Sequence, residues 1–212
     1  MSTFKEFQTL TEMKVEEGVT PKLAVFTFGR FNPPTKGHMK LISKVADLAA
    51  EHNGEAFIFP SQTVDKIMKK TGKVNPERSR NPLQWKEKIQ FMRDLFPNPQ
   101  TIIQAPEVRT PHEVLTYLDE RKFTDVMFVV GSDRMQEFQA RWLPYAQEAF
   151  HTAELVSAGA RDADSEGVPG MSSSKAREAA KTGDEGKFAA ATGWSGELAR
   201  HMMKAVRKGM GL

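Results

Sequence analysis

The sequence predicts an α/β fold: a doubly wound parallel sheet of about five strands, followed by a helical C-terminal tail. Short apolar runs that are typical of buried strands lie at 23–28, 55–60, 101–104, 124–130 and 153–157. Segments with helical spacing of apolar residues separate these runs, which favours βαβ crossovers over hairpins. The expected organisation is an N-terminal arm over 1–20, a sheet domain over 21–183, and C-terminal helices over 184–212 packed on the same domain.

Composition excludes several classes of protein. The chain has 212 residues and a net charge of +3, and its acidic residues are spread throughout. This balance suits phosphate-bearing small molecules better than nucleic acid, which needs a clustered basic face. The absence of cysteine excludes disulfides and Cys-zinc sites and favours a cytoplasmic location. No apolar run approaches the length of about 20 residues that a membrane span needs, so no membrane association is expected.

The helices are expected between and after the strands. Apolar residues at helical spacing predict helices over 39–51, 82–96 and 112–122, and a helix over 134–150 that Pro144 interrupts. A helix over 175–181 is expected to end at a turn over 182–184, and further helices follow up to Lys208. A short helix over 4–14 is expected to serve as a packing arm or as a contact in a homo-oligomer. The polar, basic segment 61–80 suits either a solvated loop or a lid beside the ligand. Residues 159–170 are expected to form a loop.

A glycine-containing turn follows the first predicted strand. The stretch from Gly29 to His38 reads GRFNPPTKGH and leads into the helix expected over 39–51. A strand, a turn and a helix N-terminus form a common phosphate site, because backbone N–H groups and the helix dipole point at one spot. Arg30, Lys36 and His38 add side-chain donors. Taken alone, Thr35 could be a helix cap and His38 a histidine bound to backbone, but the whole stretch favours phosphate binding.

This stretch resembles the signature of the nucleotidylyltransferase superfamily, in which [HT]-x-G-H follows a strand and a G-x-F-x-P turn. It is similar to the form found in nicotinamide mononucleotide adenylyltransferases, although Thr35 replaces the first histidine that those of the archaeal type usually carry. The resemblance implies a Rossmann-like sheet, with Thr35 and His38 as catalytic residues. The nucleotide-binding residues that it implies in this turn are Gly29, Arg30, Phe31, Asn32, Lys36 and Gly37.

A second glycine-containing segment follows the strand predicted over 124–130. The wider run GSDRMQEFQARW resembles an adenylyltransferase segment that reads G-x-D, then Phe, then Trp. The resemblance implies that Gly131, Ser132 and Asp133 line the nucleotide pocket and that Trp142 stacks on the pyridine ring. The alternatives are that Asp133 caps the next helix and that Trp142 packs in the core.

The third segment, MSSSKAR, opens a predicted helix near the C-terminus. Serine hydroxyls and free N–H groups at a helix start suit phosphate, and Arg177 can grip phosphate with two parallel bonds, although a plain helix start is the alternative. The segment resembles the second superfamily signature, ISSTxIR, and departs from it at Met171 and Ala176, both apolar positions. The resemblance implies phosphate binding by Ser172, Ser173 and Ser174, with Arg177 as a catalytic residue. All three segments are expected at the carboxyl edge of the sheet.

The resemblance implies transfer of AMP from ATP to the phosphate of nicotinamide mononucleotide, which forms NAD and pyrophosphate. No general base is required, so catalysis reduces to alignment of the reactants and stabilisation of charge. His38 and Thr35 would hold the α- and β-phosphates, and Ser173, Ser174 and Arg177 the β- and γ-phosphates. Mg²⁺ is expected to accompany ATP, held by phosphate oxygens and waters, and no histidine–carboxylate cluster indicates a protein metal site.

Other functions stay open. A pantetheine phosphate adenylyltransferase and a cytidylyltransferase that acts on a phospho-alcohol are alternatives of the same reaction class. A non-catalytic nucleotide-binding or structural protein with the same fold is an alternative of a different class. The presence of His38, Ser172, Ser173 and Arg177 favours an enzyme, since a broken phosphate motif would be expected otherwise. A chain of 212 residues without an anticodon module disfavours an aminoacyl-tRNA synthetase.

Overall fold

A computed structural model describes residues 20–69, 71–159 and 171–212. These residues divide into two compact units, each of which is described by itself. The sheet unit comprises residues 20–28, 41–59 and 105–159, and the helical unit comprises residues 29–40, 60–69, 71–104 and 171–212. The helix predicted over 4–14 and most of the loop predicted over 159–170 lie outside the described residues. The domain boundaries expected at 21–183 and 184–212 stay predictions.

The sheet unit is built on four strands, β1 (Leu23–Gly29), β2 (Glu55–Pro60), β3 (Asp125–Val130) and β4 (Thr152–Ser157). Their order is β2-β1-β3-β4, so β1 and β3 are neighbours although a long stretch of chain separates them. β1 pairs with β3 in parallel, and β3 pairs with β4 in parallel. This arrangement confirms the predicted doubly wound α/β fold, with four strands in the described part of the chain.

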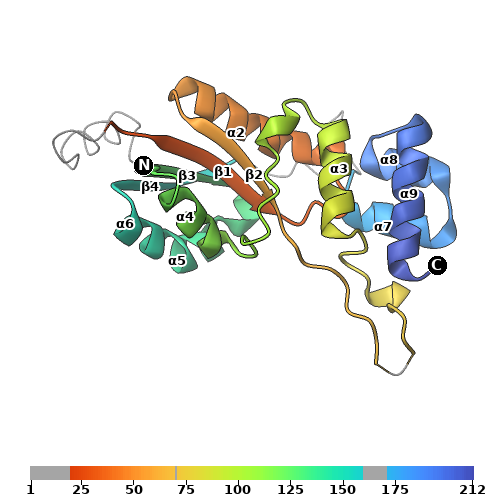
Figure 1. The fold of residues 1–212 in the computed structure, drawn as a ribbon. Helices are drawn as coiled ribbons and strands as arrows, with labels where there is room; N and C mark the ends of the chain where they lie inside the picture. Colours follow the sequence, from red (N-terminus) through yellow and green to blue (C-terminus); the bar gives the residue numbers. More distant parts are fainter. Residues whose placement is uncertain (1–19, 70, 160–170) are drawn as a thin grey trace. The chain divides into compact units, whose positions relative to one another are not determined.

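Helices cover both faces of this sheet (Figure 1). α2 (Met39–Glu51) packs Val45, Leu48 and Ala49 against Leu23, Val25, Met127 and Val129. The opposite face carries α4 (Pro111–Asp119), α5 (Met135–Arg141) and α6 (Leu143–Ala149). There, Phe26 and Phe128 stack with ring centroids 4.6 Å apart. Alternate residues of β1 and β3 therefore serve opposite faces, as period-two side-chain direction requires.

The strand predicted over 101–104 is wrong. Residues Pro99–Thr101 form a single 3₁₀ turn, η3, within the helical unit. Asn98 adopts a left-handed conformation with φ 56°, and the amides of Thr101 and Ile102 bond to the carbonyls of Asn98 and Pro99. These local bonds close the turn, and the apolar Ile102 is buried as a core residue rather than as part of a longer strand.

The helical unit contains α3 (Trp85–Leu95), α7 (Ser173–Thr182), α8 (Glu185–Thr192) and α9 (Gly196–Met210). They share one core, which comprises Leu83, Phe91, Ala176, Ala179, Ala180, Phe188, Ala191, Met202, Met203, Val206 and Met210. The alanines of α7 let its neighbours approach closely. Gly209 of α9 is needed for the same reason, because a Cβ there would lie 1.9 Å from the carbonyl oxygen of Pro82. The C-terminal helices therefore pack on the helix that the third motif opens.

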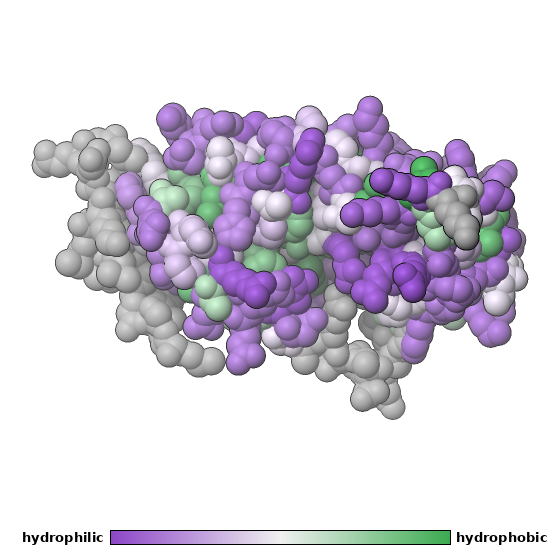
Figure 2. All heavy atoms as spheres, turned by 90° about the horizontal axis from the view of Figure 1, so that it is seen from below, coloured by the Kyte–Doolittle hydropathy of each residue, from purple (hydrophilic) through white to green (hydrophobic). Residues whose placement is uncertain are grey.

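Polar side chains dominate the face of the described residues that Figure 2 shows. The large hydrophobic residues that are exposed in the described ranges are Val64, Ile67, Met68, Tyr145 and Leu212. None of the described helices is both long and apolar enough to span a bilayer.

Candidate active site

The turn after β1 orients His38 through its own backbone. Thr35 precedes a 3₁₀ turn, η1 (Lys36–His38), and the amide of His38 bonds to the carbonyl of Thr35 at 3.0 Å. In return, the amide of Thr35 donates to Nδ1 of His38 at 3.0 Å. A backbone N–H can only donate, so Nδ1 is the acceptor and the proton of the neutral imidazole is assigned to Nε2. His38 thus presents a ring N–H donor, as a phosphate oxygen requires.

Donors from other segments hold the carbonyl oxygens of this turn. Arg177 Nη1 donates to the carbonyl of Asn32 at 2.8 Å, and Ser173 Oγ donates to the carbonyl of Pro33 at 2.8 Å. The side chain of Asn32 is buried and forms two hydrogen bonds to the backbone of Leu83, at 3.0 and 3.2 Å. Carbonyl oxygens repel anions, so turning them toward protein donors favours phosphate binding at the turn.

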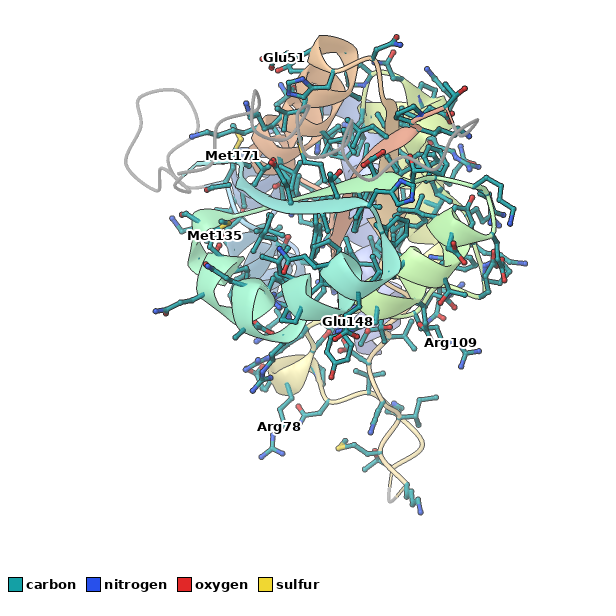
Figure 3. All side chains as sticks on the ribbon, turned by 90° about the vertical axis from the view of Figure 1, so that its left-hand side faces the viewer. Glu51, Arg78, Arg109, Met135, Glu148 and Met171 are labelled. Atoms are coloured by element: carbon teal, nitrogen blue, oxygen red, sulfur yellow. The ribbon has the colours of Figure 1, made fainter. Side chains whose placement is uncertain are left out.

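The start of α7 has the features that the third motif predicts. Ser172 is the N-cap, and its hydroxyl accepts from the amide of Lys175 at 3.1 Å. Ser174 and Arg177 lie one turn apart and are joined by a hydrogen bond of 3.1 Å from Nη2. The hydroxyl of Ser173 and one arm of Arg177 bind the first turn, so the structure brings the first and third motifs together. Met171, which leads into α7, is labelled in Figure 3.

Three arginines of the helical unit, Arg30, Arg80 and Arg177, are near enough for their charges to interact. The pKa of Arg177 lies below its ordinary value, chiefly because burial disfavours the charged guanidinium. Repulsion from the charges of Arg30 and Arg80 lowers the pKa further, whereas Asp65 and Glu178 raise it. Like charges gathered in this way favour an anionic ligand, which would relieve the repulsion.

Arg80 was missed as a site residue because its position depends on Asp65. The carboxylate of Asp65 accepts from the Ser79 hydroxyl at 2.5 Å and from the amides of Arg80 and Asn81 at 3.0 and 2.8 Å. These bonds fold the basic segment 61–80 back on itself. Arg78, two residues earlier in η2 (Pro76–Arg78), extends away from the rest of the ribbon (Figure 3). Nothing in the sequence alone distinguishes Arg80 from Arg78 as a candidate site residue.

Lys88 is a second residue that sequence reasoning missed. Its side chain is 0 % exposed, and Nζ donates to the carbonyl of Arg30 at 2.9 Å and to the carbonyl of Ser61. Burial lowers the pKa of Lys88 from its ordinary 10.5 to about 7. A signal was present, because Lys88 lies beside Ile89 and one turn before Met92 on the apolar face of α3.

The linker between α8 and α9 also contacts the first and third motifs. Lys36 places its ammonium 5.2 Å from the ring centre of Trp194, between α8 and α9. Gly193 has φ 74°, a conformation that is strained for other residues, and a Cβ there would lie 2.6 Å from the sulfur of Met171 and 3.0 Å from Cβ of Lys36. Gly37 lies nearby, where a Cβ would be 3.4 Å from the carbonyl oxygen of Met171. The tail therefore fixes where Lys36 and the start of α7 lie.

A sequence profile of the cytidylyltransferase-like family matches residues 26–179, from within β1 to within α7, and so includes all three motifs. The chain belongs to the cytidylyltransferase-like family. No curated protein sequence matches this family member.

Solved structures share the fold of this cytidylyltransferase-like chain. A protein from Vibrio parahaemolyticus assigned as a nicotinate-nucleotide adenylyltransferase aligns with a TM-score of 0.53 and 15% identity, over 86% of this chain and 99% of that one. The nicotinic acid mononucleotide adenylyltransferase of Plasmodium falciparum, in complex with APC, aligns with a TM-score of 0.50 and 12% identity, over 86% of this chain and 94% of that one. At such identities the likeness concerns the fold.

The second motif of this family member lies in the sheet unit. Gly131 precedes η4 (Ser132–Arg134), and Ser132 and Asp133 are exposed. Asp133 caps neither η4 nor α5, whose N-caps are Gly131 and Arg134. A Cβ at Gly131 would lie 2.6 Å from Oδ1 of Asp133, so glycine allows the carboxylate to lie over the turn. The pocket-lining role of this motif stays a prediction.

The stacking role predicted for Trp142 is wrong in this structure, and the core-packing alternative holds. The indole is 0 % exposed. Its ring lies 4.9 Å from the ring of Phe128 and 5.7 Å from that of Phe26, and Nε1 donates to the carbonyl of Pro111 at 3.1 Å. A ring that is enclosed by other aromatic rings and hydrogen-bonded to backbone offers no face to a ligand.

Proposed function

We propose that the protein transfers AMP from ATP to the phosphate of nicotinamide mononucleotide, forming NAD and releasing pyrophosphate. The observation that carries the proposal is the pair of hydrogen bonds from Ser173 and Arg177 to the first turn. These bonds join two halves of a triphosphate-binding signature that lie 140 and 145 positions apart in the chain. Membership of the cytidylyltransferase-like family supports nucleotidyl transfer as the reaction class.

In this reaction an oxygen of the acceptor phosphate attacks the α-phosphorus of ATP. A new P–O bond forms, the bond from the α-phosphorus to the bridging oxygen breaks, and pyrophosphate leaves with the electron pair. The attacking oxygen is already anionic at neutral pH, so no side chain has to remove a proton. The protein contributes alignment of the reactants and stabilisation of the charge that moves to pyrophosphate.

Each role goes to a group whose geometry suits it. His38 donates from Nε2 to an oxygen of the α- or β-phosphate, and Thr35 keeps the ring in that orientation through Nδ1. Arg30, Arg80 and Arg177 hold the β- and γ-phosphates, with the first turn of α7 adding backbone N–H groups. The hydrogen bonds from Arg177 to Asn32 and Ser174 hold its guanidinium plane in place for this contact.

Mg²⁺ fits this site as a companion of ATP rather than as an ion held by side chains. Across the three described ranges, no three His, Cys, Asp or Glu side chains are grouped as metal ligands. Asp65, the carboxylate near Arg177, already accepts from Ser79, Arg80 and Asn81. Phosphate oxygens and water would therefore hold the ion, which would supply charge neutralisation on the triphosphate.

A specific observation favours a second donor. The matching family is named after cytidylyltransferases, which use CTP. CTP is therefore the alternative nucleotide, and a phospho-alcohol is the alternative acceptor. The two structural neighbours are named as adenylyltransferases of nicotinate nucleotide and of nicotinic acid mononucleotide. The acid form of the mononucleotide is therefore a further candidate acceptor.

An assay with paired donors and acceptors tests the proposal. The purified protein is incubated with Mg²⁺, either ATP or CTP, and one of nicotinamide mononucleotide, nicotinate mononucleotide, pantetheine phosphate or a phospho-alcohol. We expect pyrophosphate release and a product of the mass of NAD with ATP and nicotinamide mononucleotide. Turnover only with another pair would reassign the substrate. Nucleotide binding without pyrophosphate from any pair would identify a binding protein and contradict the proposal.

A further inference from the structure

We propose that Lys88 is a positioning residue of the phosphate site, whose ammonium fixes the turn after β1 by binding the carbonyls of Arg30 and Ser61. The inference rests on the proposed function only for the identity of the ligand. It starts from an unusual feature of the helical unit: Lys88 lies fully buried on the apolar face of α3 and donates to two backbone carbonyls. Burial lowers the pKa of Lys88, and among the described residues no neighbouring carboxylate offsets this effect.

A buried ammonium without a carboxylate partner costs stability, so a purely structural explanation accounts for it poorly. An apolar side chain of similar length would fill the same space. The two carbonyls that Lys88 binds are the informative part. Arg30 is the second residue of the first motif, and Ser61 directly follows β2 and donates its own amide to the carbonyl of Gly29 at 2.7 Å. Lys88 therefore ties together the chain segments that leave the two strands.

Residues at the start of α3 form further hydrogen bonds to the same two chain segments. The indole N–H of Trp85 donates to the carbonyl of Pro60 at 3.0 Å, one turn before Lys88. Leu83, just ahead of α3, holds the side chain of Asn32. Residues 83–88 thus anchor both segments, and Lys88 is the charged member of the set.

The orientation of the carbonyl groups in the turn after β1 affects how well the turn can bind an anion. Those of Arg30, Asn32 and Pro33 accept from Lys88, Arg177 and Ser173, respectively. Because the peptide unit is planar, a carbonyl held toward Lys88 turns the N–H of the next residue, Phe31, the opposite way. Loss of the Lys88 bond would release the first of these carbonyls, and its negative end would be free to face the phosphate.

The charge of Lys88 links the site to pH. A bound anion favours the ammonium and so raises the pKa of Lys88 from about 7. Above that pH the complex must take up a proton, so affinity for the anion falls as pH rises. Other charged groups near these segments include Arg30, Asp65, Arg80 and Arg177, and all four are the same in every variant compared. His38 is common to every variant compared.

Hydrogen exchange decides the positioning role without any ligand. Lys88→Met should speed amide exchange in residues 29–32 and 61–63 by about tenfold or more, while thermal melting shows a folded protein. Lys86→Met, an exposed position on the same helix, should exchange as the wild type does. Unchanged exchange in folded Lys88→Met would overturn the proposal.

Lys88→Arg provides a second arm, which keeps the test valid if Lys88→Met fails to fold. Arginine retains donors and a charge that does not titrate. ATP affinity of the wild type should fall several-fold between about pH 6.5 and about pH 8.5, and that of Lys88→Arg should fall less. Equal falls would overturn the role of the Lys88 charge. Failure of the wild type to bind ATP would contradict the proposed function instead, and hydrogen exchange would still decide the role of Lys88.

Discussion

Substitution of His38 by alanine is expected to lower the rate of nucleotidyl transfer by about 10² to 10³-fold, the loss typical for removal of one donor aimed at developing charge. The ring N–H at Nε2 is the donor, and the Thr35 amide on Nδ1 fixes its direction. Binding of ATP in the ground state should weaken less than turnover, because the contact strengthens as the α-phosphorus reacts. Steady-state pyrophosphate release and ATP titration measure the two effects separately.

The fold should survive this change. His38 is only half-buried, and η1 is also closed by the backbone bond from His38 to Thr35, which alanine keeps. His201→Ala serves as the matched control, since His201 is an exposed histidine of the same unit on α9. Full activity of His38→Ala, with the same melting temperature as the control, would remove His38 from the mechanism.

Substitution of Arg177 by alanine is the second large effect that we expect. It removes a cation from the phosphate site and the bond that holds the carbonyl of Asn32. Turnover at saturating acceptor and the affinity for ATP should both fall, with a combined loss of about 10² to 10³-fold in kcat/KM for ATP. Arg177→Lys should recover only part of this loss, because lysine cannot bind Asn32 and a phosphate with one planar fork.

Lys187→Ala is the control for loss of a positive charge in the helical unit. Lys187 is exposed on α8 and pairs with Asp184 at 3.1 Å. Its removal should leave kcat/KM unchanged, since surface ion pairs contribute little. If Lys187→Ala and Arg177→Ala lost activity equally, the effect would be one of net charge, and the specific role of Arg177 would be refuted.

Local chemistry made much of the fold and the site predictable. The two central strands, β1 and β3, are largely apolar runs, and the N-cap of α7 is Ser172, within the serine cluster of the MSSSKAR segment. The first and third motifs could be paired because each carries its donors within ten residues of chain. Their contact through Ser173 and Arg177 is the tertiary result of those two local patterns.

A local turn and tertiary packing decided the rest. The run at 101–104 has strand composition, but the turn at Asn98 and Pro99 prevails. Trp142 follows a motif-like segment, yet the aromatic rings of Phe26 and Phe128 enclose it. Arg80 gains its place from Asp65, fifteen positions earlier. Lys88 alone carried a readable signal, as a charge on an otherwise apolar helix face.

The central claim is that the turn after β1 and the start of α7 form one triphosphate site. A crystal structure of the protein with Mg²⁺ and a non-hydrolysable ATP analogue tests it most directly. We expect phosphate oxygens within about 3 Å of His38 Nε2, of Arg177 and of the first backbone amides of α7. A nucleotide bound elsewhere, with none of these groups in contact with its phosphates, would contradict the claim.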